Sequence, residues 1–150
     1  MDGERHAWEI RPMRVDDLAE VAELEQAVSP GPWSPNIFLA CLQADHECWV
    51  LRMDRVAGFA IASLGAGEAH LLNLAVAPSE QGLGFGGRLL RKVIEVARER
   101  GAERIFLEVR PSNLRAQVIY RKVGFEFLSR RPKYYGPPRR EDALVYTMTI

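Results

Sequence analysis

The chain has 150 residues, of which 47% are hydrophobic and 27% charged, and its 20 basic and 20 acidic side chains cancel. This length fits one domain with a buried core, so we expect residues 1–150 to form a single soluble domain. The balanced charge excludes a general attraction to nucleic acid or to an anionic membrane, because such attraction requires a net positive charge.

Local features agree with this class of protein. Cys41 and Cys48 are interpreted as reduced core thiols rather than a disulfide, which fits a cytoplasmic location. No apolar run approaches the roughly 18 residues of a membrane span, and residues 1–6 lack the apolar core of a targeting signal. A basic cluster is interpreted as a solvated loop, with local RNA contact left open: Arg130, Arg131, Lys133, Arg139 and Arg140.

The hydrophobic pattern predicts a first group of elements in chain order. Residues 8–14 form a strand, after which Asp16 caps a helix that ends at residues 29–32. Ser34 caps a second, short helix. Three strands follow and are expected to form an antiparallel meander, at residues 48–53, 56–63 and 69–76.

The second half of the chain predicts a crossover. Residues 84–100 have apolar side chains at helical spacing until Gly101, and residues 105–109 form a strand that should run parallel to the strand before the helix. A further helix ends at Gly124, and two closing strands complete the chain: residues 113–123, then 125–129 and 143–150. The prediction is an α/β (α+β) fold with a mixed, mostly antiparallel sheet of about six to seven strands and about four helices.

Glycines are concentrated between strand 69–76 and helix 84–100, in the segment Gln81-Gly82-Leu83-Gly84-Phe85-Gly86-Gly87. Glycines permit close approach of an anion, and the free N–H groups of a helix start attract phosphate. We therefore predict a pyrophosphate site, against the alternative of a turn that merely requires glycine. The segment also satisfies the dinucleotide pattern G-x-G-x-x-G, but the preceding meander and the short chain after it disfavour a dinucleotide fold.

Glu108 and Tyr120 are candidate acid–base residues. Glu108 lies in an apolar strand, so burial is expected to raise its pKa toward that of a useful base; the alternative is an ion pair, for example with Arg110. Tyr120 lies in the next helix and offers a phenol with a reference pKa of roughly 10, although it could equally be a core aromatic. The histidines are scattered, so we predict neither a metal site nor an acyl-enzyme.

The segment Gln81-x-x-Gly84-x-Gly86 resembles the Q/R-x-x-G-x-G/A signature of the GNAT N-acetyltransferase superfamily. Nearly the whole chain resembles the RimI-type ribosomal-protein alanine N-acetyltransferases, through residues 32–34, 72–76, 107–110, 112–113, 119–120, 124–125, 134–135 and 140–143. The resemblance implies a GNAT fold that transfers an acetyl group from acetyl-coenzyme A to the N-terminal alanine of a small-subunit ribosomal protein. The alternatives are a small-amine or lysine acetyltransferase and a coenzyme A-binding module without activity.

The resemblance also implies roles for individual residues, with Glu108 as the base and Tyr120 as the acid. The cofactor would be held by Leu74, Ala75, Val76, Gln81, Gly82, Leu83, Gly84, Phe85, Gly86, Gly87 and Asn113. The acceptor groove would be bordered by Trp33, Tyr134, Tyr135, Glu141 and Asp142, where an acidic group could hold a protonated N-terminus. Phe85 and Gly87 depart from the aliphatic and basic residues that are frequent in relatives. Asn113 by itself would be interpreted as a helix cap.

Overall fold

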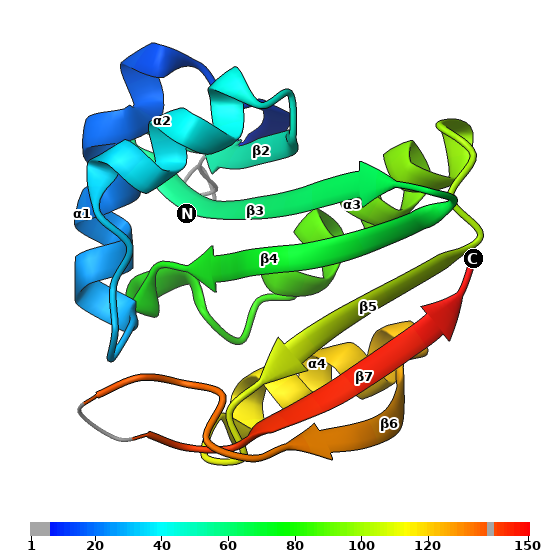
Figure 1. Ribbon diagram of the computed structural model, residues 1–150. Helices are drawn as coiled ribbons and strands as arrows, with labels where there is room; N and C mark the ends of the chain where they lie inside the picture. The colour runs from blue at the N-terminus through cyan, green and yellow to red at the C-terminus, as the bar shows by residue number, and fades with distance from the viewer. Residues whose placement is uncertain (1–6, 138–139) are drawn as a thin grey trace.

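The structure, a computed structural model, describes residues 7–137 and 140–150. Its strands are β1 (Glu9–Pro12), β2 (Glu47–Arg52), β3 (Val56–Gly65), β4 (Glu68–Val76), β5 (Arg104–Val109), β6 (Glu126–Arg131) and β7 (Ala143–Thr149). Its helices are α1 (Leu18–Val28), α2 (Pro35–Gln43), α3 (Phe85–Glu99) and α4 (Leu114–Val123), with 3-10 turns at Val15–Asp17 and Pro78–Glu80. Every predicted element is present, as Figure 1 shows. Arg139 and the N-terminal residues 1–6, which the sequence-based interpretation used, lie outside the described residues.

All seven strands join one sheet in the order β1-β2-β3-β4-β5-β7-β6. The strands from β1 to β4 form the predicted antiparallel meander. β4 and β5 run parallel, as the crossover through α3 requires, and β7 lies antiparallel between β5 and β6. The predicted mixed, mostly antiparallel sheet with four flanking helices is confirmed.

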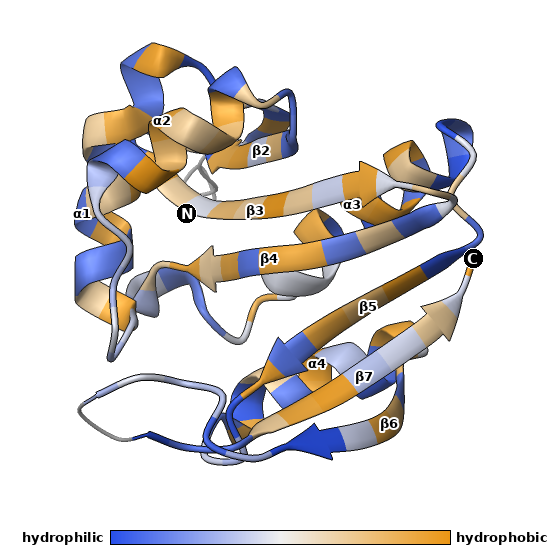
Figure 2. Ribbon diagram, in the orientation of Figure 1, coloured by the Kyte–Doolittle hydropathy of each residue, from blue (hydrophilic) through white to orange (hydrophobic). Residues whose placement is uncertain are grey.

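Helices cover both faces of the sheet, with α1 and α2 on one face and α3 and α4 on the other (Figure 1). The apolar side chains of each layer meet the sheet in a separate core, and Figure 2 shows hydrophobic positions alternating with polar ones along the strands and helices. The core under α1 and α2 contains Val21, Leu24, Phe38, Val50 and Phe59. The two layers fix the sheet on both sides, so that it serves as a rigid support for the site.

The buried face of α3 follows directly from its sequence pattern. Leu89, Leu90, Val93, Ile94 and Ala97 recur at helical spacing, and each is at most 5% exposed. Burial of each larger side chain contributes roughly 1.5–3 kcal/mol relative to exposure. This face therefore anchors the helix whose first residues belong to the glycine-rich segment.

Several helix ends agree with the sequence and one differs. Gly101 and Gly124 end α3 and α4 with φ of +92° and +123°, and Asn113 caps α4 by accepting a backbone N–H of its first turn at 3.1 Å. Ser34 occupies the N-cap position of α2, but its side chain makes no capping hydrogen bond. Its backbone carbonyl accepts the N–H of Ile37 instead, at 3.0 Å.

The expectation that Asp16 caps the first helix is wrong, because the neighbouring Asp17 closes this turn. The Asp17 carboxylate accepts the backbone N–H of Arg14 at 2.8 Å and two hydrogen bonds from the Arg11 guanidinium at 2.8 and 2.9 Å. The hydrogen bonds from Arg11 are the main reason why the pKa of Asp17 lies below its ordinary value. Asp16 is exposed, so the turn uses the carboxylate that faces the half-buried guanidinium of Arg11.

Cys41 and Cys48 are buried free thiols, as predicted. Burial raises the pKa of both, that of Cys48 to about 12. A thiol with so high a pKa carries almost no thiolate at neutral pH, so neither cysteine is suited to act as a nucleophile.

Candidate functional site

The site begins where two parallel strands separate. β4 pairs with β5 only from Glu68↔Arg104 to Leu71↔Leu107, although β4 continues to Val76. A cavity of about 240 Å³ opens beside this separation. It is lined by Glu25, Val28, Ser29, Pro30, Gly31, Trp33, Leu71, Leu72, Asn73, Leu74, Ala75, Glu108, Val109, Arg110, Asn113, Tyr120 and Tyr135. Candidate residues from four distant segments of the sequence therefore meet in one place.

A β-bulge in β4 sets which side chains face each wall. The pairing of β3 with β4 shifts between Ile61↔Asn73 and Ala62↔Leu71, which leaves Leu72 without an opposite residue. A bulge reverses the alternation of side chains beyond it. Leu71 accordingly packs in the core under α3, whereas Ala75 packs in the core under α1. Asn73 follows the bulge and is turned toward α1, where its amide meets Glu25 at 3.2 Å.

Glu108 lies on the opposite wall, and its side chain is 8% exposed. Its Oε1 accepts a hydrogen bond from Nε2 of His70 at 2.6 Å and a longer one from the Tyr134 hydroxyl at 3.5 Å, while Oε2 lies 3.9 Å from a nitrogen of Arg131. The alternative of an ion pair is met by Arg131, whereas Arg110, the partner named as an example, bonds to the carboxylate of Glu141 at 3.4 Å. Glu108 is therefore a nearly buried carboxylate whose main partner is a histidine.

His70 is a residue that sequence reasoning missed. It lies 38 positions before Glu108, and the parallel register places it opposite Phe106, two residues along β5 from Glu108. Its ring also stacks on Phe106, with 4.3 Å between the ring centroids. Side chains two positions apart on a strand share a face, so this register brings the imidazole to the carboxylate. Only the strand register, which the sequence did not specify, could have revealed the pair.

Tyr120 lines the cavity from α4 and is 6% exposed. Burial, with a smaller contribution from Tyr135, raises the pKa of its phenol well above the ordinary value of 10. Its ring packs against Phe125, with 5.8 Å between the ring centroids. The interpretation of Tyr120 as a core aromatic and its interpretation as a candidate acid are compatible, since the ring belongs to the core and the residue borders the cavity. At neutral pH the phenol keeps its proton and can donate a hydrogen bond.

The glycine-rich segment leads from the end of β4 into α3. Gly82 and Gly84 have φ of +85° and +86°, which a residue with a Cβ adopts only with strain. The first N–H groups of α3 have no partner within the helix, and its first turn carries no acidic residue. Gly86 packs closely against α4, since an added Cβ would lie 3.1 Å from Cδ1 of Ile119 and would require that side chain to shift. The segment therefore fits a bound pyrophosphate.

Other predicted cofactor residues are placed differently from one another. Gln81 donates from its amide to the carbonyl of Val76 at 2.9 Å, which ties the segment to β4. Leu83 is exposed, whereas Phe85 is buried in the core under α3 and meets the Trp8 ring edge-on, with 5.4 Å between the ring centroids. The remaining predicted cofactor residues fall into two groups: Leu74, Ala75 and Asn113 line the cavity, and Gly87 lies in the first turn of α3.

The predicted acceptor residues also divide. Trp33 and Tyr135 line the cavity, and Tyr134 contacts Glu108. The carboxylates of Glu141 and Asp142 are instead used to hold the segment between β6 and β7. Glu141 accepts hydrogen bonds from Ser112 Oγ at 2.9 Å, the Ser112 backbone N–H at 3.3 Å and Arg110 at 3.4 Å. Asp142 accepts hydrogen bonds from Arg130 at 2.7 Å and the backbone of Lys133 at 2.9 Å.

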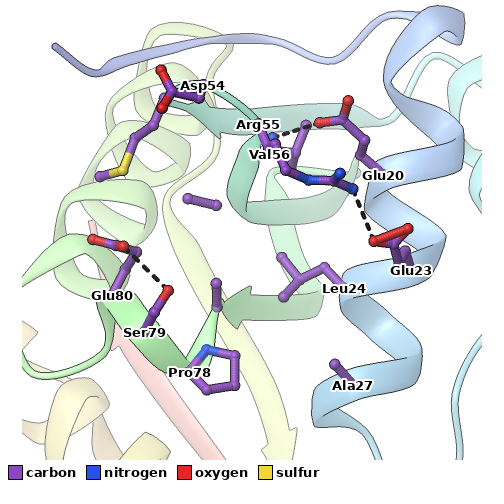
Figure 3. A pocket seen from close by; sticks show the side chains of 13 residues that line it. Glu20, Glu23, Leu24, Ala27, Asp54, Arg55, Val56, Pro78, Ser79 and Glu80 are labelled. Atoms are coloured by element: carbon purple, nitrogen blue, oxygen red, sulfur yellow. Dashed lines mark hydrogen bonds and ion pairs between the residues drawn. The ribbon is translucent and has the colours of Figure 1, made fainter. Parts of the chain in front are cut away.

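A second cavity, of about 400 Å³, is lined by residues 77–80, by residues 53–57 and by one face of α1. Figure 3 shows its acidic lining, in which Glu23 pairs with Arg55 at 2.8 Å. Four carboxylates line the cavity beside the single guanidinium of Arg55, so it would repel a phosphate-bearing ligand: Glu20, Glu23, Asp54 and Glu80. The smaller cavity, which holds Glu108 and Tyr120, is therefore the better candidate site despite its size.

Two further properties concern the described part of the chain. Across residues 7–137 and 140–150, no three histidine, cysteine or acidic side chains are grouped closely enough to hold a metal ion. None of the helices in these ranges has the length and apolar character needed to span a membrane.

Comparison with known proteins identifies the family. The model of the Acetyltransferase (GNAT) family matches residues 10–125. The chain belongs to this family. Its sequence is 37% identical over 133 residues to the [Ribosomal protein bS18]-alanine N-acetyltransferase of Haemophilus influenzae, which covers 86% of this chain and 90% of that protein. The predicted membership in the GNAT family and in its RimI-type branch is confirmed.

Solved structures agree with this assignment. The crystal structure of the ribosomal-protein-S18-alanine N-acetyltransferase from Escherichia coli superposes with a TM-score of 0.87 at 32% identity and covers 96% of this chain and 94% of that chain. Ard1 from Thermoplasma volcanium gives a TM-score of 0.90 at 25% identity, over 96% and 98% of the two chains. The predicted GNAT fold is confirmed, and the protein is an N-acetyltransferase that uses acetyl-coenzyme A.

Proposed function

We propose that this acetyltransferase modifies the N-terminal α-amine of a ribosomal protein, an alanine of the bS18 type, by direct attack of the amine on acetyl-coenzyme A. The observation that carries the proposal is the meeting of Glu108 and Tyr120 in the cavity beside the separated strands. The names of the relatives support the substrate. In this proposal the chain forms a single domain that acts in the cytoplasm and makes no stable contact with membrane or nucleic acid.

The cofactor fits the residues around the opening. The N–H groups at the start of α3 would hold the pyrophosphate, and the edge of β4 beyond Leu71, where pairing with β5 ends, would receive the pantetheine arm along Leu74 to Val76. The bound thioester supplies an activated acetyl carbon. Asn113 lines the cavity at the start of α4, where its side-chain oxygen already caps the helix and its amide group is the part left to contact the cofactor.

Glu108 acts as the base in this proposal. An α-amine has a reference pKa of about 8, so at neutral pH a useful fraction is already neutral and the base must remove only one proton. A lysine amine, with a reference pKa of about 10.4, is much harder to deprotonate. His70 holds the Glu108 carboxylate at 2.6 Å and can share the proton that it accepts. This chemistry favours an α-amine over a lysine side chain as the acceptor.

Tyr120 acts as the hydrogen-bond donor and acid toward the leaving sulfur. Burial keeps its phenol protonated at neutral pH, which is the state that the role requires. The thiol of coenzyme A has a reference pKa near that of cysteine, about 8.5. The pKa of the Tyr120 phenol is higher, so complete proton transfer from this phenol to the thiolate would be unfavourable. We therefore assign the phenol first to stabilising the negative charge that develops on sulfur, with proton transfer completing as the thiol leaves.

Thiol release from acetyl-coenzyme A tests the function. The acceptors are an alanine-starting peptide with the sequence of the bS18 N-terminus, the same peptide with a blocked N-terminus, and free polyamines. Release only with the free N-terminus is expected. Release only with polyamines would leave the family and cofactor in place but overturn the acceptor, and binding of acetyl-coenzyme A without release to any amine would point to a binding module.

A further inference from the structure

One buried carboxylate in the cavity wall has no part in the proposed acid–base steps. Glu25 lies on α1, is 2% exposed and lines the cavity. Its pKa is raised, chiefly because burial disfavours the charged form. Among the residues that the structure describes, no lysine, arginine or histidine side chain forms an ion pair with it. A carboxylate in this position is costly, so it must be compensated by a specific gain.

Both oxygens of this carboxylate are used to join separate parts of the wall. Oε2 accepts the backbone N–H of Trp33 at 3.0 Å, and Oε1 accepts the side-chain amide of Asn73 at 3.2 Å. Trp33 belongs to the segment between α1 and α2, whereas Asn73 follows the bulge of β4. In Figure 1 the C-terminal part of α1 lies beside the end of β4, where this connection is made. A single side chain thus links a helix, a strand and a loop.

The loop that Glu25 holds forms one side of the cavity. Val28, Ser29, Pro30, Gly31 and Trp33 all line it, and residues 29–34 have no regular secondary structure. The hydrogen bond from Trp33 to Glu25 spans eight positions in the sequence. Within the described residues, no other backbone N–H of this loop donates to a side chain of a helix. The Trp33 ring is supported below by Phe38, with 5.2 Å between the ring centroids. The placement of this wall therefore depends on the carboxylate.

We propose that Glu25 is a positioning residue: by accepting one hydrogen bond from Trp33 and one from Asn73 it fixes the α1–α2 loop against β4 and so shapes the groove that receives the acceptor peptide. The inference rests on the proposed function, because it concerns the wall that would border the acceptor. It assigns no proton transfer to Glu25. The opposing hypothesis is that its charge directly holds the acceptor ammonium.

The test compares three variants. In Glu25→Gln the amide oxygen can accept a hydrogen bond from only one of the two donors, the Trp33 N–H or the Asn73 amide. The NH₂ group of the glutamine then faces the other donor. The exchange variant Glu25→Gln/Asn73→Asp restores both contacts, with the Gln amide donating to the new carboxylate and its oxygen accepting the N–H of Trp33, and it keeps the net charge. Glu23→Gln is the matched control, since Glu23 lies on the same helix but is exposed and pairs with Arg55 at 2.8 Å outside this cavity.

Two ligands separate positioning from charge: the alanine-starting peptide and its Nα-acetylated product, which has no ammonium group. Loss of one hydrogen bond to a charged group should weaken binding of both peptides by about tenfold in Glu25→Gln. We expect KM for the peptide to rise by a similar factor, with kcat and KM for acetyl-coenzyme A little changed. The exchange variant should recover most of the loss, and Glu23→Gln should match the wild type.

The contrary outcomes are distinct. Weaker binding of the free peptide alone would show that Glu25 holds the ammonium, and unchanged binding of both peptides would show that it serves only the fold. Failure of the exchange variant to recover, with its thermal unfolding midpoint intact, would also overturn the proposal. Absence of peptide acetylation by the wild type would instead overturn the proposed acceptor; the same variants would then be compared with the amine that the enzyme does acetylate and with its acetylated product.

Discussion

Replacement of Tyr120 by Phe separates a chemical role from a structural one. The change removes only the hydroxyl, and in the described residues this hydroxyl makes no hydrogen bond to another side chain or to the backbone. No buried donor or acceptor is left without its partner, so the free energy of unfolding should change by less than about 1 kcal/mol. Loss of a donor to the leaving sulfur should lower kcat by about 10²-fold, at the lower end of the range for a general acid.

Tyr146→Phe is the matched control for this prediction. Its hydroxyl accepts a hydrogen bond from Arg121 at 2.8 Å and donates one to Gln117 at 3.4 Å, and it does not line the cavity. Removing it should cost about 1–2 kcal/mol of stability. For a chain of this length that corresponds to a fall in Tm of roughly 2–8 °C. Its kcat should stay near that of the wild type.

The assay measures kcat by thiol release at saturating acetyl-coenzyme A and peptide, together with Tm by scanning calorimetry, for both variants and the wild type. The expected result is a double dissociation, with activity lost in one variant and stability lost in the other. Full activity of Tyr120→Phe would refute the assignment of Tyr120 to the leaving sulfur. A large fall in Tm for the same variant would show that its hydroxyl supports the core.

Three further changes test other parts of the account. Glu108→Gln should lower kcat by about 10²–10⁴-fold while leaving the affinity for acetyl-coenzyme A nearly unchanged; equal turnover, measured by thiol release, would remove it as the base. Gly84→Ala should cost about 1 kcal/mol of stability, because φ at this position is +86°. The added Cβ would meet no protein atom within 4 Å and would extend into the space proposed for the pyrophosphate, so KM for acetyl-coenzyme A should rise. An unchanged KM would argue against the predicted pyrophosphate site. Asp17→Asn should cost roughly 1.5–3 kcal/mol at pH 7, since it removes charge-assisted hydrogen bonds from a part-buried pair with Arg11. Because the folded pKa of Asp17 lies below its ordinary value of 3.8, the difference in stability from the wild type should be complete above that pH and shrink as pH falls through the folded pKa. A difference in urea unfolding that stays constant with pH would contradict this.

The sequence predicted the fold well because its signals are local. The apolar stripe of α3, the glycines that end α3 and α4, and the alternation in the strands each depend on neighbouring residues. The parallel pairing of β4 with β5 followed from the order strand, helix, strand, because such a crossover connects parallel strands. The prediction of the residue that caps the first helix failed, because the choice between Asp16 and Asp17 depends on Arg11, which lies in another element.

The site was predictable only in part. The sequence setting made Glu108 and Tyr120 candidates, the family resemblance suggested their roles, and both line the cavity. The contact of Glu108 with His70 requires a strand register that no local pattern encodes. Glu25 did leave a signal, because a glutamate occupies a position in the apolar stripe of α1. Its partner Asn73 is turned toward it by the bulge at Leu72, and a bulge is not visible in the alternation alone.

The central claim is transfer of an acetyl group to an N-terminal α-amine, and tandem mass spectrometry of one product tests it most directly. The acceptor is a single alanine-starting peptide that also contains a lysine, so both amines are present at equal concentration. We expect the acetyl group on the α-amine of the N-terminal alanine and none on the lysine. An acetyl group found on the lysine, or on neither amine, would contradict the account.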